Sequence, residues 1–247
     1  MPEPDEAKVS SPVLRGVGSR KAPLLPGADK GGNLSNKSST SLLIDSIAKG
    51  VYSAILKPIG YRKVARNFSK QSGDLYQVVS FQSSWLNTPD EAQFAVNLHI
   101  TLPFFAEIWS GREFPSNPGQ AANLVQVRLN KNLPLTGDHW WKITPKSDPL
   151  PLIDDISHLL VEKGLEFLDE RTNLEWILMA VAGKKSKEAH PLGIVYPPEV
   201  VHAILMAYFG KVEDAYKLLN QAKLNEKSPW QGYDIMLERL RHKPNQV

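Results

Sequence analysis

Histidine is the side chain most suited to metal binding or proton transfer near neutral pH, and this chain contains six. None lies two or four residues from another, so no pair would place two imidazoles on one metal ion from a single strand or helix. His99 follows Asn97 in an alternating segment and could form an enzymatic site with Asn97 and Gln82 if it faces a cavity. An enzyme built around His99 is therefore one alternative function. The six are His99, His139, His158, His190, His202 and His242.

A basic run precedes that segment. No acidic residue occurs from position 57 to 73, whereas five cations do: Lys57, Arg62, Lys63, Arg66 and Lys70. Cations among aromatic residues are typical of surfaces that bind small anions or single-stranded nucleic acid. The same pattern also protects an edge strand from aggregation. The run 57–70 therefore indicates either a small-anion or nucleic-acid binding module or a structural edge strand.

Three amides lie among large apolar residues. Asn67, Gln82 and Asn97 each occupy or end a predicted strand. A partly buried amide without a hydrogen bond costs about 1–3 kcal/mol, so these side chains should bond to one another or line a polar pocket. The candidate binding residues are Arg62, Arg66, Asn67, Gln82, Trp85 and Asn97, and we assign no catalytic residue and no metal ligand.

Motifs of other chemistries do not occur. The chain has no GxxxxGK[ST] or GxGxxG phosphate loop and no GxSxG nucleophile elbow. Asp154 and Asp155 are adjacent carboxylates, but neighbours on a helix point about 100° apart and do not share a site. The absence of cysteine removes thiol nucleophiles, disulfides and cysteine-ligated zinc sites. We therefore expect no cofactor.

The composition is that of a soluble globular protein. Of the 247 residues, 42% are hydrophobic and 22% are charged, and the formal net charge is +3. No apolar run approaches the roughly 18 residues of a membrane span, and the N-terminus shows no apolar signal-peptide core. These features predict a cytoplasmic protein that does not enter a membrane. The small net charge neither requires nor excludes nucleic acid.

Periodicity indicates the elements that would position these side chains. Residues 1–40 are rich in Pro, Gly, Ser, Lys and Asp without a sustained period, which predicts a disordered tail. Apolar residues at helical spacing predict a helix from Ser41 that Pro58 and Gly60 end. Residues 103–120 predict a loop. Five strands are predicted, at 62–69, 75–83, 93–102, 124–129 and 140–143. The strand 62–69 is basic, 75–83 is expected at the centre of the sheet, and 93–102 has one apolar and one polar face.

After Pro151 the period becomes helical. Helices are predicted at 152–168, 172–182, 198–209, 211–224 and 229–241, with a charged surface loop at 184–190. This order predicts an α+β fold with an N-terminal helix, an antiparallel sheet of about four to five strands and a C-terminal helical extension. The predicted domains are the tail 1–40, an α+β domain at 41–170 and a helical extension at 171–247 that packs on it.

Several short motifs within 41–170 together resemble a known family. They are Leu56-Lys57-Pro58-Ile59-Gly60-Tyr61, Asn67-Phe68, Phe81-Gln82 and Phe94-Ala95-Val96-Asn97-Leu98, with weaker agreement at Trp140-Trp141 and 164–168. The segment resembles the bacterial family called domain of unknown function 4304. The resemblance implies a stand-alone bacterial domain and supplies no catalytic or binding residues. The long polar N-terminus and the helices after position 170 depart from that plan.

These observations favour a non-enzymatic role. Trp109, Trp140 and Trp141 are expected to be exposed, and tryptophans are frequent anchors at protein interfaces. The first hypothesis is therefore a bacterial cytoplasmic protein that binds another protein, for example an immunity-like protein that neutralises a toxin. The alternatives are a small-anion or nucleic-acid binding module that uses the basic strand 57–70 and an enzyme around His99.

Overall fold

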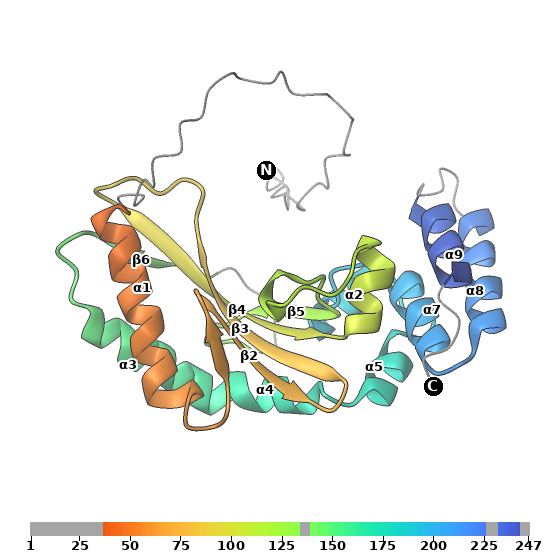
Figure 1. The fold of residues 1–247 in the computed structure, drawn as a ribbon, viewed down its shortest axis with the longest axis horizontal. Helices are drawn as coiled ribbons and strands as arrows, with labels where there is room; N and C mark the ends of the chain where they lie inside the picture. The colour runs from red at the N-terminus through yellow and green to blue at the C-terminus, as the bar shows by residue number, and fades with distance from the viewer. Residues whose placement is uncertain (1–36, 134–138, 226–231, 243–247) are drawn as a thin grey trace, which may run out of the picture. The chain divides into compact units, whose positions relative to one another are not determined.

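The computed structural model describes residues 37–133, 139–225 and 232–242, so most of the predicted tail lies outside the described residues. The fold is α+β, as predicted, with a helix, an antiparallel sheet and further helices in that order (Figure 1). The strands are β1 (Arg62–Val64), β2 (Asn67–Ser72), β3 (Leu75–Ser83), β4 (Ala92–Thr101), β5 (Val125–Arg128) and β6 (Trp141–Ile143).

The helices divide into an N-terminal one, a short one after β4 and a C-terminal series. The α-helices are α1 (Ser39–Val51), α2 (Pro103–Ser110), α3 (Pro149–Leu159), α4 (Leu165–Glu170), α5 (Leu174–Val181), α6 (Ser186–Ala189), α7 (Pro198–Tyr208), α8 (Val212–Asn225) and α9 (Gly232–His242). The π-helical turns η1 (Tyr52–Leu56) and η3 (Leu160–Gly164) continue α1 and α3, and the 3-10 turns are η2 (Pro118–Gln120) and η4 (His190–Leu192). Within the described ranges, no helix has the length and apolar character needed to cross a bilayer.

The sheet is antiparallel throughout the described residues. Strands β1 to β5 follow in chain order, and β6 pairs with the beginning of β4. The predicted strand 62–69 is two strands, because the chain reverses at Ala65, whose φ of 54° is unusual for a residue with a side chain. Over the described ranges the sheet therefore has six strands, and the predicted central segment 75–83 lies at its centre as β3.

One sheet face is the apolar core, and α1, α3 and α4 cover it (Figure 1). Aromatic rings run across this face. Phe81 and Phe94 are stacked with centroids 5.8 Å apart, and Trp141 continues the stack at 5.8 Å from Phe94. The indole Nε1 of Trp141 donates a 2.8 Å hydrogen bond to Asp155 of α3. Trp141 is only 5% exposed, so the expectation that it lies on the surface was wrong.

The opposite sheet face is polar, but segment 112–123 covers part of it. The predicted polar side of β4 contains Asn97, His99 and Thr101, and all three are buried. Thr101 donates a 2.6 Å hydrogen bond to the carbonyl of Ala122 in the covering segment. The predicted alternation of an apolar and a polar side in β4 is therefore present, but the alternation did not indicate that the polar side is also covered.

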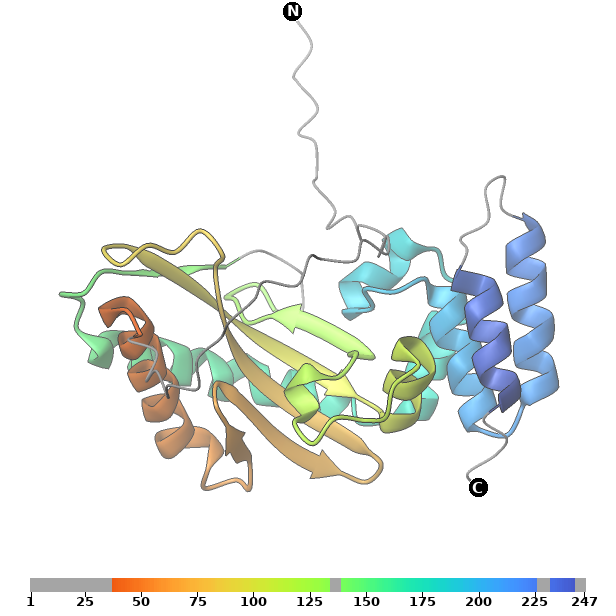
Figure 2. The ribbon, with the colours of Figure 1, turned by 45° about the horizontal axis from the view of Figure 1, so that its top comes forward.

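Helix α2 replaces part of the predicted loop 103–120. Pro103 occupies the first turn of α2, where the missing N–H is not needed. The helix ends at Gly111, whose φ is 68°, and Arg239 of α9 donates to the carbonyls of Ile108 and Trp109 in its last turn. This contact joins α9 to α2, and Figure 2 shows α7, α8 and α9 side by side next to α2. The predicted charged loop 184–190 likewise contains a short helix, α6.

Candidate functional site

The polar sheet face brings together residues from four strands. The antiparallel register aligns Asn67 of β2 with Ser80 of β3, Ser80 with Asn97 of β4, and Asn97 with Arg128 of β5. Residues directly opposite one another in a sheet point to the same face, so these four side chains form one row. Two of the predicted binding residues, Asn67 and Asn97, therefore lie in the same row.

The predicted amides are only partly connected to one another. Asn97 donates a 2.8 Å hydrogen bond from Nδ2 to the amide oxygen of Gln82, and Gln82 is exposed. The Oδ1 atom of Asn97 is buried and has no hydrogen-bond partner among the described residues. Asn67 instead packs under Gly119 of η2, where a Cβ atom would lie 2.5 Å from Cγ of Asn67. The amides thus form one bonded pair and one separate packing contact.

His99 lies beneath the covering segment. It is 6% exposed, and its Nε2 lies 3.0 Å from the hydroxyl of Ser80. Burial lowers the pKa of His99 to about 4, while the nearby Asn123 side chain opposes this shift. The imidazole is therefore neutral at pH 7, and a substrate could reach it only if segment 112–123 moved.

A cation–aromatic pair that we did not predict lies beside the amide pair. The guanidinium of Arg128 stands over the ring of Trp140, 4.4 Å from its centroid. Trp140 is half-buried rather than fully exposed, and so is Trp109, whose centroid lies 4.1 Å from that of Tyr196. The alternation in 124–129 could have indicated Arg128, because that residue falls on the polar side of its strand.

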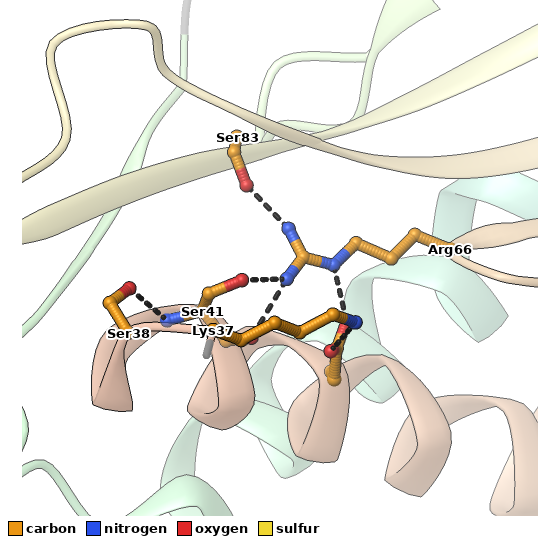
Figure 3. Close-up of polar contacts among 6 residues, drawn as sticks. Lys37, Ser38, Ser41, Arg66 and Ser83 are labelled. Atoms are coloured by element: carbon orange, nitrogen blue, oxygen red, sulfur yellow. Dashed lines mark hydrogen bonds and ion pairs between the residues drawn. The ribbon is translucent and has the colours of Figure 1, made fainter. Parts of the chain in front are cut away.

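The predicted contact Arg66 is occupied within the protein, in what we call the Arg66 clamp (Figure 3). Its Nε donates to Asp45 at 2.6 Å, and its Nη1 donates to the hydroxyl of Ser83 at 2.5 Å. Its Nη2 donates to the carbonyl and the hydroxyl of Ser41 at 2.7 and 2.9 Å. Asp45 also accepts from Lys37 at 2.7 Å. The guanidinium thus fastens the β1–β2 turn and the end of β3 to α1.

The clamp also lowers the pKa of Asp45. Burial alone would raise the pKa of Asp45, but the hydrogen bonds and positive charges of Lys37 and Arg66 together hold that pKa below its usual value. The carboxylate is therefore fully ionised at pH 7. Because four of its five N–H groups are already used by the protein, Arg66 has little capacity to bind an external anion.

The other cations of the basic run do not gather around Arg66. Arg62 and Lys63 are exposed on β1, and Lys57 is exposed in the turn before it. Lys70 lies 6.0 Å from the ring centroid of Tyr61, in weak cation–π contact. Arg62 faces the polar side of the sheet, because it pairs in register with Ser69.

Trp85, the last predicted binding residue, stands apart in the loop between β3 and β4. We call residues 84–91 the Trp85 loop. Trp85 is 90% exposed and Leu86 is 59% exposed. A tryptophan with so little intramolecular contact leaves a large apolar surface in water.

Hydrogen bonds hold the base of the Trp85 loop. The backbone N–H of Ser84 donates to the carbonyl of Gln93 at 3.0 Å, and the N–H of Leu86 donates to the Ser84 hydroxyl at 3.2 Å. The amide of Asn87 then joins both sides of the loop: it donates to the carbonyl of Gln93 at 3.0 Å and accepts from the N–H of Gln93 at 2.8 Å. The chain on either side of Trp85 is therefore fixed.

Further hydrogen bonds close the tip. Thr88 and Glu91 exchange bonds in both directions: the N–H of Thr88 donates to the carbonyl of Glu91 at 2.8 Å, and the N–H of Glu91 donates to the Thr88 hydroxyl at 3.1 Å. Thr40 of α1 donates to the carbonyl of Thr88 at 3.3 Å. The loop thus presents Trp85 on a prearranged backbone that is also tied to α1.

A pocket of about 220 Å³ lies at the base of the Trp85 loop. It connects the loop to β6 through Lys142, which pairs in register with Gln93. The pocket is lined by Leu86, Asn87, Glu91, Ala92, Gln93 and Lys142. Leu86, which follows Trp85 in the chain, belongs to this lining, whereas Trp85 does not.

Among the described residues, no group of three or more His, Asp or Glu side chains is placed to hold a metal ion. A family model described as Domain of unknown function (DUF4304) matches residues 52–170, which confirms the resemblance predicted from the motifs. No curated protein and no solved structure matches the chain significantly.

Proposed function

We propose that this protein is a binding module for another protein and that the Trp85 loop is its anchor. The observation that carries this proposal is the 90% exposure of Trp85 on a loop whose backbone is already fixed. Tryptophan is enriched among the residues that contribute most to binding at protein interfaces. A prearranged loop also loses little conformational entropy when a partner binds, which raises affinity.

The surroundings of Trp85 support a protein partner more than a small ligand. Leu86 extends the apolar surface, and the pocket beside it contains both Glu91 and Lys142. An apolar centre with charged residues of both signs around it is the usual anatomy of a protein interface. The two alternatives have weaker support, because Arg66 is held in its clamp and His99 is buried.

The experiment is affinity capture from the native host under gentle lysis, with the full chain and two single variants compared by quantitative mass spectrometry. Trp85→Ala should reduce recovery of the partner at least about tenfold, as expected for a central anchor. Trp176→Ala, in α5, is the matched control because Trp176 is also a surface tryptophan, 43% exposed. Equal recovery with Trp85→Ala and the unaltered protein, or no partner at all, would contradict the proposal.

The finer hypothesis is tested by the identity of that partner. An immunity-like role in the cytoplasm requires the captured protein to be a toxin whose activity falls when it is bound. Trp85→Ala should then fail to protect cells that express the toxin. Because Trp85 is so exposed, its replacement should change the free energy of unfolding by no more than about 0.5 kcal/mol. Loss of protection therefore could not be attributed to unfolding.

A further inference from the structure

A second pocket lies far from the Trp85 loop, where the β2–β3 turn, the beginning of α2 and the end of α7 meet. Its volume is about 240 Å³. It joins a part of the chain within the family match to the helices that follow it. The lining includes the polar side chains of Gln71 and Asp74 and the aromatic residues Tyr76, Phe104 and Tyr208.

Among the described residues that line this pocket, Asp74 alone carries a charge. Its Oδ2 accepts a 2.5 Å hydrogen bond from the hydroxyl of Tyr208, whereas Oδ1 accepts none from the described residues. Burial, together with the hydrogen bond and the charge of Asp74, raises the pKa of Tyr208 to about 12. Tyr208 therefore remains a proton donor at neutral pH, and Oδ1 of Asp74 is available to a ligand.

Aromatic residues line the pocket beside this carboxylate. The ring of Tyr208 lies 5.7 Å from that of Phe104 with an interplanar angle of 60°. Tyr76 is held by stacking on Phe114 at 5.4 Å. Aromatic faces attract cations through the ring quadrupole, and a carboxylate adds direct charge.

The remaining polar groups are acceptors or neutral. Gln71 uses its amide nitrogen on the carbonyl of Gly73 at 3.1 Å, which leaves the amide oxygen available to a donor. The pocket lies at the start of α2 and the end of α7, whose partial charges have opposite signs and offset each other. The full charge of Asp74 therefore decides which ligands are attracted. A single carboxylate is too few ligands for Ca²⁺ or Mg²⁺, so an organic cation fits better.

We propose that this pocket binds an organic cation, an ammonium or guanidinium group on a short aliphatic stem, between Asp74 and the aromatic residues Tyr76, Phe104 and Tyr208. The cation bonds to the free Oδ1 of Asp74 and stands against the rings. The group can belong to a small amine or to a lysine or arginine side chain of a peptide. Both share the same chemistry and are separated by the test below.

Two variants distinguish binding from a purely structural tether between Asp74 and Tyr208. Asp74→Asn retains an oxygen that can accept from the Tyr208 hydroxyl but removes the charge. Tyr208→Phe removes the tether but retains both the ring and the charge. Cation binding should be lost with Asp74→Asn and retained with Tyr208→Phe. If the contact is only a structural tether, Tyr208→Phe should lower the free energy of unfolding and Asp74→Asn should not, and neither the variants nor the unaltered protein should bind the cation.

The measurement is a titration of the full ¹⁵N-labelled chain with n-butylammonium chloride, followed by amide chemical shifts. Saturable shifts at Asp74, Tyr76 and Tyr208 should give a millimolar Kd, as expected for a ligand of about five non-hydrogen atoms. n-Butanol, the neutral analogue, should cause none of them. Asp74→Asn should bind at least about tenfold more weakly, whereas Tyr208→Phe should bind within about threefold of the unaltered protein.

Equal shifts with butanol, binding unchanged in Asp74→Asn, or no saturable shift would overturn the proposal. The spectra themselves report whether each variant is folded. A backbone-blocked lysine is titrated in parallel to identify the source of the cation. Tighter binding of the blocked lysine than of n-butylammonium indicates a peptide side chain, and the reverse order indicates a small amine.

Discussion

Replacing Arg66 by lysine separates the clamp from an anion-binding role. Lysine retains the positive charge, but it cannot reproduce a planar guanidinium that donates in several fixed directions. If Arg66 bound an external anion, Arg66→Lys would retain much of that binding. If Arg66 is a clamp, Arg66→Lys should lose most of the hydrogen bonds to Asp45, Ser41 and Ser83 and destabilise the fold.

The size of the effect follows from the contacts. The Arg66 side chain is 20% exposed and Asp45 is 31% exposed, so the ion pair contributes no more than a partly screened surface pair, about 1 kcal/mol. The three bonds to Ser41 and Ser83 add about 0.5–1 kcal/mol each because the groups are only partly buried. Because lysine can keep the ion pair but not the other three bonds, we expect Arg66→Lys to lower the free energy of unfolding by about 1.5–3 kcal/mol, or Tm by about 3–10 °C.

The assay is urea unfolding followed by circular dichroism at pH 7. Arg62→Lys is the matched control, because Arg62 belongs to the same basic run but is exposed, and it should change the free energy of unfolding by less than about 0.5 kcal/mol. A double-mutant cycle of Arg66→Met with Asp45→Asn should give a coupling energy of about 1 kcal/mol. Arg66→Lys with unchanged stability would refute the clamp. Oligonucleotide retention that survives Arg66→Lys but is lost in Arg66→Met without loss of stability would favour the binding role.

Three other predictions concern the core and the helical part of the chain. The folded-state pKa of His99 is about 4, below its ordinary value of 6.5, so the unfolded state takes up more protons as pH falls, and the free energy of unfolding should drop by about 2 kcal/mol from pH 7 to pH 5. His99→Gln should remove this contribution when urea unfolding is measured at the two pH values. An identical pH dependence in the variant would contradict the prediction. Gly119→Ala should lower the free energy of unfolding by about 1–3 kcal/mol, because the new methyl group meets Asn67. Adding Asn67→Ala should restore part of this stability in thermal unfolding, and no recovery would show that the contact with Asn67 is not the cause. Arg239→Met should leave the carbonyls of Ile108 and Trp109 at the end of α2 without this donor, and amide hydrogen exchange should therefore increase in α9 and in residues 106–111. Unchanged exchange would show that this contact does not hold α9.

The periodic parts of the fold could be predicted from the sequence, and the breaks in periodicity account for most errors. Strands β3 and β4 and helices α1, α7 and α8 are continuous patterns with ordinary start and stop residues. The prediction of a loop at 103–120 missed helix α2, although Pro103 suits the first turn of a helix, where proline is favoured. The turn at Ala65 gave no signal, because an alanine at φ 54° is imposed by tertiary structure rather than by its own preference.

For the candidate site, the sequence could predict only which residues lie on neighbouring strands. Asn67 and Asn97 were expected on nearby strands, and the register places them in one row. Arg66 could not be assigned from sequence, because its partners Ser41 and Asp45 lie on a helix whose position depends on the packing of the whole sheet. The burial of His99 likewise depends on the path of segment 112–123, which has no regular period.

Site-specific photo-cross-linking tests the central claim most directly. A benzophenone amino acid is placed at position 85 and, as a control of similar exposure, at position 224, where Leu224 is 84% exposed on α8. After irradiation of living host cells, position 85 should give a discrete cross-linked protein that position 224 does not give. The same products at both positions, or none at position 85, would contradict the assignment of the Trp85 loop as the anchor for a protein partner.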